Sequence, residues 1–294
     1  MRSPDGWHLT DDVDVFLGRA GDFLRSRAAL HTMQVTAAEG IRTAIRTGPG
    51  RMRVRAGFGW LAEGGEVGGA FVRVGEGLLG LTPVSPGQAE ALAVRLAGAG
   101  YRVPGVSAGE GAAAAFATAW ERRTGATAAF RGRLRLYRLA GLVEPRPAPP
   151  GRARRADSAD RDRLVAWCAD FAAAVGDPTV VTSATWAGTR FAAKRFTFWQ
   201  TPDGSPAALA GATAPVAAHV RIDPVYTPPH LRGQGYAAAV TAAVARSALA
   251  AGVTDVALFA DPANATSNAL YRRLGFVPLT DVAHYAFTDG RAPT

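Results

Sequence analysis

Hydrophobic and polar positions change period from segment to segment, and the C-terminal half alternates between strand and helix patterns. Acidic Asp157 and Asp160 predict a helix start, and apolar Leu164, Trp167 and Phe171 continue that helix. Further helices are predicted over 236–251 and 266–273, each ending at a glycine. Strands are predicted over 152–156, 194–200, 207–213, 217–227, 256–260, 276–277 and 282–287. This order predicts an α/β (α+β) fold with a mixed, mostly antiparallel sheet flanked by helices.

The N-terminal half repeats this order more faintly. Helices are predicted over 12–27 and 89–97, and strands around 58–60 and 70–72 flank a glycine turn. These matches occur in the same order as in the second half and at a nearly constant offset, which predicts the duplication of one fold. The proline-rich segment 144–151 has the pattern of an extended linker. We therefore expect two domains, residues 1–150 and residues 151–294.

The composition is that of a soluble protein with real hydrophobic cores. The chain has 294 residues, of which 48% are hydrophobic and 19% charged, a length typical of about two globular domains. No apolar run reaches 18 residues, and the N-terminus through Trp7 lacks the apolar core of a signal peptide. Cys168 is the single cysteine, which excludes an internal disulfide framework. The expected location is the cytoplasm, with no membrane contact.

The net charge of +9 raises the question of an anionic partner. The 33 basic residues include only one lysine, Lys194, and the arginines are spread over both halves without a long basic run. This distribution favours a bias in composition over nucleic-acid binding, so no nucleic acid is expected as a partner. The five histidines show no metal-ligand spacing, so no metal is expected.

Residues 225–237 are the first candidate for chemistry, because a predicted strand ends there and a helix begins. Gly233 and Gly235 allow the backbone to approach a ligand closely. The first turn of the helix that follows presents unpaired N–H groups and the positive end of the helix dipole, which suits a phosphate group. A plain strand–helix turn explains the same glycines, and this segment alone favours that interpretation.

A second segment decides between them. Asn264 stands seven positions before Tyr271, and Leu274–Gly275–Phe276 follows. The earlier run Arg232–Gly233–Gln234–Gly235–Tyr236–Ala237 fits the pattern Gln/Arg-x-x-Gly-x-Gly/Ala. With both motifs in this order, residues 151 to about 288 resemble the Gcn5-related N-acetyltransferase (GNAT) superfamily. The Val–Tyr–Thr–Pro–Pro run at 225–229 is similar to that of a group of actinobacterial acetyltransferases.

The resemblance implies acetyl-CoA as a co-substrate and assigns residues to it. Backbone amides of the glycine loop would hold the pyrophosphate, the strand end would pair with the pantetheine arm, and Asn264 would hydrogen-bond that arm. The implied binding residues are Val225, Tyr226, Thr227, Arg232, Gly233, Gln234, Gly235, Tyr236, Ala237 and Asn264. Ser267 and Asn268 would either contact CoA or cap the short helix. Tyr271 would protonate the departing thiolate as a general acid, and a packing role in the core is its alternative.

The general base is less well defined. Many relatives use a glutamate on the strand before the loop, but here every glutamate precedes Gly151. On that strand His219, Arg221 and Asp223 alternate with apolar residues and form a polar face expected to look toward the acceptor. Asp223 and His219 are therefore the candidate bases, each acting through a water molecule. An ion pair between Arg221 and Asp223 is the structural alternative.

The N-terminal half lacks both chemical motifs. Thr82 to Gln88 stand where the glycine loop is expected, and Trp120 or Phe116 replaces the tyrosine. We therefore expect tandem GNAT-like domains, in which residues 1–150 are a degenerate copy without CoA motifs and 151–294 the catalytic domain.

The function expected from these residues is N-acetyl transfer from acetyl-CoA to a primary amine of a small-molecule acceptor by direct attack. One alternative is another tandem GNAT acyltransferase, similar to mycothiol synthases or to aminoacyl transferases. Another is a non-catalytic regulatory module that binds acetyl-CoA. The expected partners are acetyl-CoA and the amine, and the chain is expected to be a monomer or a homodimer.

Overall fold

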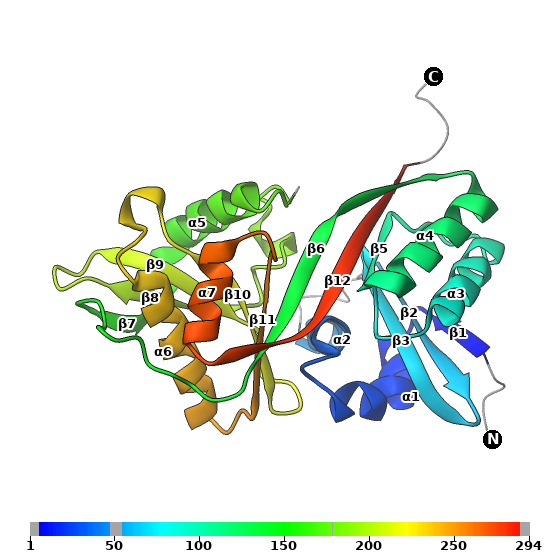
Figure 1. The fold of residues 1–294 in the computed structure, drawn as a ribbon, viewed down its shortest axis with the longest axis horizontal. Coiled ribbons are helices and arrows are strands. Elements are labelled where there is room, and N and C mark those ends of the chain that lie inside the picture. Colours follow the sequence, from blue (N-terminus) through cyan, green and yellow to red (C-terminus); the bar gives the residue numbers. More distant parts are fainter. Residues whose placement is uncertain (1–5, 48–54, 178, 289–294) are drawn as a thin grey trace. The chain divides into compact units, whose positions relative to one another are not determined.

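The computed structural model describes residues 6–47, 55–177 and 179–288 (Figure 1). The first five residues, which belong to the segment expected to lack a signal peptide, and the last six of the expected second domain lie outside this part. The chain forms two compact units, one of Met1–Leu136 with Leu279–Thr294 and one of Tyr137–Pro278. Each unit is described separately below.

The second unit is built on a mixed sheet. Its elements are β7 (Arg152–Arg155), η1 (Ser158–Asp160), α5 (Arg161–Ala174), η2 (Trp186–Gly188), β8 (Arg195–Gln200), β9 (Pro206–Ala212), β10 (His219–Tyr226), η3 (Pro229–Leu231), α6 (Tyr236–Ala250), β11 (Asp255–Ala260) and α7 (Ala265–Arg273). The strands β7 to β10 pair antiparallel in chain order, and β11 pairs parallel with β10. The predicted elements of this half are confirmed to within a few residues, apart from the two closing strands, which form one continuous strand.

Side chains of β9 alternate between two hydrophobic cores on opposite faces of the sheet. Leu209 belongs to the core beneath α5, together with Phe198, its partner on β8. Ala208 and Ala210 belong to the core beneath α6. The small alanines on this face let the alanine-rich helix α6 lie close to the sheet. The sheet therefore carries α5 on one face and α6 on the other.

The first unit repeats this architecture. Its elements are β1 (Gly6–Thr10), α1 (Val13–Ser26), α2 (Thr32–Thr47), β2 (Ala56–Glu63), β3 (Glu66–Val74), β4 (Leu79–Leu81), α3 (Pro86–Gly98), β5 (Gly105–Gly109) and α4 (Glu110–Thr124). The strands β1 to β4 pair antiparallel, and β5 pairs parallel with β4, as β11 does with β10. The repeated order and pairing give the mixed α/β class in both units, as predicted.

The unit boundary differs from the expected boundary at Gly151. It falls inside two long strands, β6 (Thr127–Leu139) and β12 (Phe276–Thr288). The last residues of β6 belong to the second unit, and residues 282–286 of β12 pair with β5 in the first unit. Each half of the chain therefore supplies strand residues to the other unit, which periodicity alone does not reveal.

The proline-rich segment is not a free linker, because it packs on the second unit. The Val143 amide donates to the Leu274 carbonyl at 3.0 Å, and the Trp199 indole donates to the Pro150 carbonyl at 3.1 Å. Gly275 has a φ of +90°, and a Cβ there would collide with the carbonyl of Gly141. The glycine of the Leu–Gly–Phe motif is thus required both by its left-handed backbone and by this crossing segment.

Candidate active site

The parallel strands β10 and β11 separate at the centre of the second unit. Their pairing runs from His219 with Asp255 to Ile222 with Leu258 and ends there, although both strands continue. On its other edge β10 shifts register between Ile222 and Val225 in its pairing with β9. Such a bulge bends a strand, and a proline lacking an N–H, Pro224, is tolerated at this point. Backbone groups of Val225 and Tyr226 on the β11 side are therefore left for a ligand.

A buried hydroxyl marks the end of this opening. Thr227 follows β10 directly, and its Oγ1 is buried without a hydrogen-bond partner among the described residues. A buried hydroxyl without a partner is costly, so its position suits a polar group of a ligand. The Arg232 side chain spans the loop from here, because its Nε donates to the Thr227 carbonyl at 3.1 Å.

The loop that follows presents backbone amides to solvent. Gly233 and Gly235 have φ values of +79° and +82°, a conformation that side chains with a Cβ rarely adopt. Gly235 is the N-cap of α6 and provides no side-chain cap, so the first-turn amides of α6 have no capping partner. Gln234 is exposed between the glycines, while the Tyr236 ring is buried in the core and Ala237 is half-buried. These amides form a terminus suited to a phosphate.

The corresponding terminus in the first unit is closed by its own side chains. Ser85 caps α3 by accepting from the Gln88 amide at 3.2 Å, and Gln88 Oε1 accepts from the Ser85 amide at 2.8 Å. Gln88 also donates to a carboxylate oxygen of Glu63 at 2.8 Å. A capped terminus with a carboxylate beside it is unsuited to a second anion.

Two asparagines stabilise α7, one as its N-cap and one through buried hydrogen bonds. Asn264 is the N-cap, and its Oδ1 accepts from the Ser267 amide at 3.0 Å. Asn268 is buried, donates to the carbonyls of Asp261 and Asn264 at 2.7 Å each, and accepts from the Tyr137 hydroxyl at 2.6 Å. All its strong hydrogen bonds are thus within the protein, and Asn268 holds α7 in place.

Tyr271 lies on α7 with its ring in the core and is 8% exposed. Its ring packs against those of Tyr137, with centroids 6.3 Å apart, and Phe276, 6.1 Å apart. Its hydroxyl makes no hydrogen bond to the residues that the structure describes. Burial raises the pKa of Tyr271, and the negative charge of Asp223 raises it further, so the phenol stays protonated. Tyr271 on α7 is therefore close enough to Asp223, at the bulge of β10, to interact with it electrostatically.

Asp223 occupies the bulge and is surrounded by basic groups. The same carboxylate oxygen, Oδ2, contacts Lys194 Nζ and accepts from Arg190 Nη1 at 2.6 Å. Burial alone would raise the pKa of Asp223, but the charges of Lys194, Arg190 and Arg221 outweigh it and hold the pKa far below its ordinary value. Asp223 is therefore ionised and is by itself a weak base. Neither Lys194 nor Arg190 was predicted from the sequence as a site residue.

The structure does not bring His219 to this site. His219 pairs with Asp255 at the start of β10, about 13 Å from Asp223 along an extended strand. It is 0% exposed, and burial lowers the pKa of His219 to about 4. It is thus a neutral, buried side chain away from the opening.

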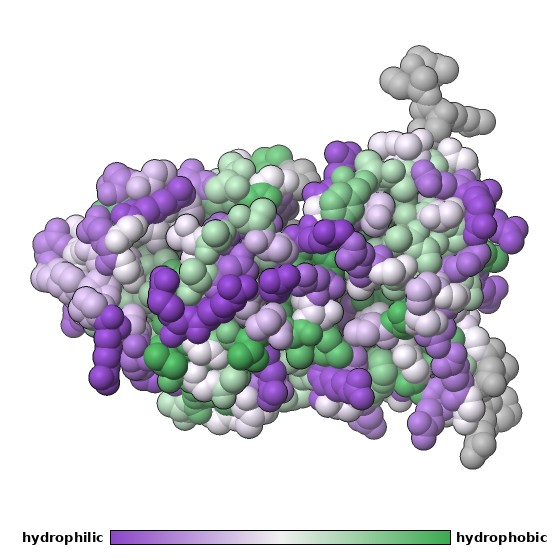
Figure 2. Space-filling view, viewed as in Figure 1, coloured by the Kyte–Doolittle hydropathy of each residue, from purple (hydrophilic) through white to green (hydrophobic). Residues whose placement is uncertain are grey.

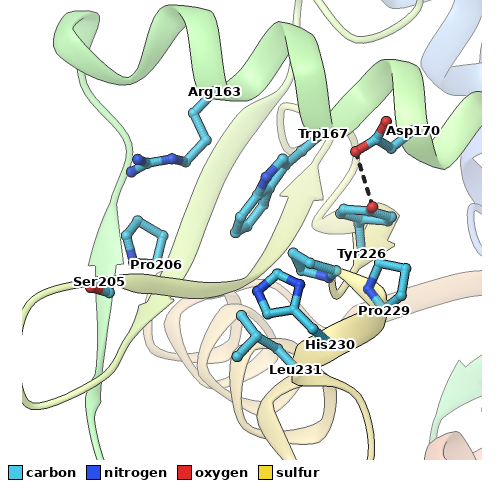
Figure 3. A pocket seen from close by; sticks show the side chains of 10 residues that line it. Arg163, Trp167, Asp170, Ser205, Pro206, Tyr226, Pro229, His230 and Leu231 are labelled. Carbon is cyan, nitrogen blue, oxygen red and sulfur yellow. Dashed lines mark hydrogen bonds between the residues drawn. The ribbon is translucent and has the colours of Figure 1, made fainter.

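A pocket of about 430 Å³ lies on the α5 side of the glycine loop (Figure 3). Trp167 and Asp170 extend from α5 toward Tyr226, whose hydroxyl donates to Asp170 Oδ2 at 3.1 Å. His230 and Leu231 line the opposite wall. The Tyr226 side chain therefore faces α5, and only its backbone is directed along the sheet edge.

A parallel strand pair that separates, an uncapped helix after a Gly-x-Gly loop and a protonated tyrosine beside the opening together define an acyltransferase of the GNAT type. Residues 163–276 match the family model described as Acetyltransferase (GNAT) family. This match lies within the second unit and includes the glycine loop and Tyr271, so this part of the chain is a GNAT domain.

Several solved structures resemble the chain in fold. A GCN5-related N-acetyltransferase from Sphaerobacter thermophilus has 17% identity and a TM-score of 0.58 over 99% of this chain and 98% of that chain. A tandem GNAT protein from the clavulanic acid biosynthesis pathway has 15% identity and a TM-score of 0.54 over 98% and 100%. A GCN5-related N-acetyltransferase from Kribbella flavida has 20% identity and a TM-score of 0.52 over 76% and 87%. No curated protein matches the chain in sequence.

The residues that the structure describes form neither a metal-binding cluster nor a membrane-spanning helix. No group of three or more His, Cys, Asp or Glu side chains is placed to hold a metal ion there. No helix in the same residues is long and apolar enough to cross a membrane. On the face shown in Figure 2, hydrophilic residues lie in several separate groups interspersed with apolar ones.

Proposed function

We propose that this protein is an N-acetyltransferase that moves the acetyl group of acetyl-CoA to a primary amine of a small molecule. The observation that carries the proposal is the uncapped N-terminus of α6 behind Gly233 and Gly235, next to the strand opening. We propose the cytoplasm as its location, because Cys168 is the single cysteine.

Binding of acetyl-CoA is assigned to the β10–α6 connection. The amides from Gly233 to Ala237 would hold the pyrophosphate, and the exposed Arg232 would add positive charge. The backbone of Val225 and Tyr226 and the unpartnered Thr227 hydroxyl would receive the pantetheine arm. Asn264 would reach that arm through its amide nitrogen, because its Oδ1 caps α7. Ser267 and Asn268 then serve as structural residues of α7.

Bound acetyl-CoA supplies an activated thioester carbonyl at the opening. The acceptor amine attacks this carbon directly, and Tyr271 donates its phenolic proton to the departing sulfur. Its raised pKa keeps Tyr271 protonated until charge develops on that sulfur. Asp223 is a candidate to orient the amine beside the thioester, since it is ionised and lies at the bulge.

The first unit is proposed to bind no CoA. The α3 terminus that corresponds to the glycine loop is occupied by the Ser85–Gln88 capping box, with Glu63 beside it. One acetyl-CoA per chain is therefore expected in calorimetry. Two equivalent sites per chain would contradict the assignment of the first unit as a degenerate copy.

The test of the function is release of free thiol from acetyl-CoA in the presence of a panel of primary amines. Cys168 is fully buried, and burial raises its pKa to about 12, so the protein itself contributes little thiol signal. We expect amine-dependent thiol release together with an acetylated amine in mass spectrometry. Binding of acetyl-CoA without transfer to any amine would instead indicate a regulatory module, and no binding at all would refute the proposed site.

A further inference from the structure

Lys194 is the only lysine among the 33 basic residues of the chain. The other 32 basic positions are arginine, including Arg190, which contacts the same carboxylate oxygen as Lys194. An arginine is therefore accepted beside Asp223, yet position 194 is a lysine. Lysine can lose its proton near neutral pH, whereas arginine remains charged. This difference directs attention to proton transfer at position 194.

The Lys194 side chain is almost completely enclosed. It is 5% exposed, and its Nζ contacts Asp223 Oδ2 at the bulge where β10 separates from β11. The ring of Phe191 lies 5.6 Å from Nζ. The amine is thus held by one carboxylate and one aromatic face, next to the proposed position of the thioester.

Charged and titratable groups approach Lys194 from several elements. Asp223 and Arg221 come from β10, Arg190 from the segment before β8, and Cys168 from α5. Asp157 and Arg161 line an adjoining pocket of about 280 Å³ together with Lys194. The Tyr271 hydroxyl lies within the electrostatic reach of the same Asp223.

Compared with water, these surroundings favour the neutral form of the Lys194 amine. Burial lowers the pKa of Lys194 to about 8, and Arg221 and Arg190 act in the same direction against the opposing charge of Asp223. At pH 7 about one molecule in ten then carries a neutral Lys194, compared with about one in 2,500 for an ordinary lysine. Cys168 is unsuited to accept the proton, because burial raises the pKa of its thiol to about 12 and the thiol already carries its proton at pH 7.

We propose that Lys194 accepts the proton that the ammonium group of the acceptor must lose before it attacks acetyl-CoA. This inference rests on the proposed function. The acceptor transfers one proton to neutral Lys194, whose ammonium form is then stabilised by Asp223. The neutral amine forms the C–N bond, the C–S bond breaks, and Tyr271 protonates the sulfur and regains a proton from the acylated nitrogen. Lys194 returns its proton to solvent.

The first test needs no substitution and no turnover. Because Lys194 is the only lysine, protein labelled with ¹³C at lysine Cε gives a single side-chain resonance. We expect its chemical shift to titrate with a midpoint near pH 8, far below the ordinary value of about 10.4. A resonance that stays in the charged form up to pH 10 would overturn the proposal, whatever the activity of the enzyme.

The second test compares Lys194→Arg with wild type over a range of pH. If Lys194 serves only as a structural cation, arginine can take over its role. If Lys194 accepts a proton, arginine cannot, because it stays charged. We expect Lys194→Arg to bind acetyl-CoA normally but to lose about 10²–10⁴-fold in kcat/KM at pH 7, with the gap narrowing as the acceptor amine loses its own proton in solution. Arg195→Lys, at an exposed neighbouring position, is the control and should retain the wild-type profile.

The outcomes distinguish a failure of the Lys194 role from a failure of the proposed function. A wild-type activity in Lys194→Arg would overturn the role of Lys194 and leave the proposed transferase intact. A wild-type protein that acetylates no amine would overturn both, even with a titration midpoint near pH 8. If Lys194→Arg does not fold, Lys194→Met with the same measurements and the wild-type titration decide the question.

Discussion

Tyr271→Phe separates catalysis from folding more cleanly than other changes at the site. The ring keeps its contacts with Tyr137 and Phe276, and the hydroxyl that is removed has no hydrogen-bond partner among the described residues. No buried group is left unpaired, so the free energy of unfolding should change by less than about 1 kcal/mol. The hydroxyl is proposed to act only as charge develops on sulfur, so kcat should fall while acetyl-CoA affinity stays unchanged.

The expected loss in kcat is about 10²-fold, at the low end for general acid catalysis, because water can replace the phenol in part. This corresponds to about 2.7 kcal/mol of transition-state stabilisation. The small exposed fraction of Tyr271 leaves a route for such a water molecule.

Tyr137→Phe is the matched control, since the two rings are neighbours. The Tyr137 hydroxyl is buried and donates to Asn268 Oδ1 at 2.6 Å, so its removal leaves that oxygen unpaired. The free energy of unfolding should fall by about 1–3 kcal/mol, while kcat of the folded protein should be close to that of wild type.

The assay combines urea unfolding of both variants with thiol release at saturating acetyl-CoA and amine. A pre-steady-state burst would show whether chemistry or product release limits the rate. The reasoning is refuted if Tyr271→Phe turns over at the wild-type rate when chemistry is limiting. It is also refuted if Tyr271→Phe loses mainly stability while Tyr137→Phe loses mainly kcat.

Three further changes test other parts of the argument. Asp223→Asn removes the carboxylate that raises the pKa of Lys194, so the acidic limb of kcat/KM, where the rate rises as Lys194 loses its proton, should move to lower pH; an unchanged limb would contradict the coupling. Gly235→Ala places a Cβ at a φ of +82°, a strain of about 1–2 kcal/mol, and should weaken acetyl-CoA binding in calorimetry about tenfold, whereas Gly204→Ala, at +87° in a remote turn, should not. The side-chain hydrogen bond from Arg154 lowers the pKa of Asp160 from its ordinary 3.8, so this pair stabilises the fold above about pH 4 and loses its effect as the pH falls through the folded-state pKa. The stability gap between wild type and Asp160→Asn in urea should therefore shrink below pH 4, and a gap that grows there would be evidence against the assignment.

Local chemistry made much of the second unit predictable. The acids Asp157 and Asp160 do start a helix, and they form a reciprocal capping box there. The glycine loop was predicted because Gly233 and Gly235 follow a strand and precede a helix in a pattern that lets the backbone approach a ligand, and both residues have a positive φ. In the first unit, the helix over 32–47 and the strand Gly105–Gly109 were not predicted. That strand consists mostly of small residues, and pairing with β12 stabilises it, a long-range contact that periodicity does not report.

The sequence by itself determined the order of the elements in the second unit, the positions of the glycine loop and Tyr271, and the resemblance of that half to GNAT proteins, because each depends on neighbours within a few residues. Only the tertiary structure decided which polar residues meet. Alternation placed His219 and Asp223 on one strand, but burial left His219 enclosed and far from the bulge. Lys194 is 29 positions from Asp223 in the chain, and folding brings them into contact. Burial then sets the charge of that pair, since a low dielectric and neighbouring cations act on a side chain only after the chain has folded around it.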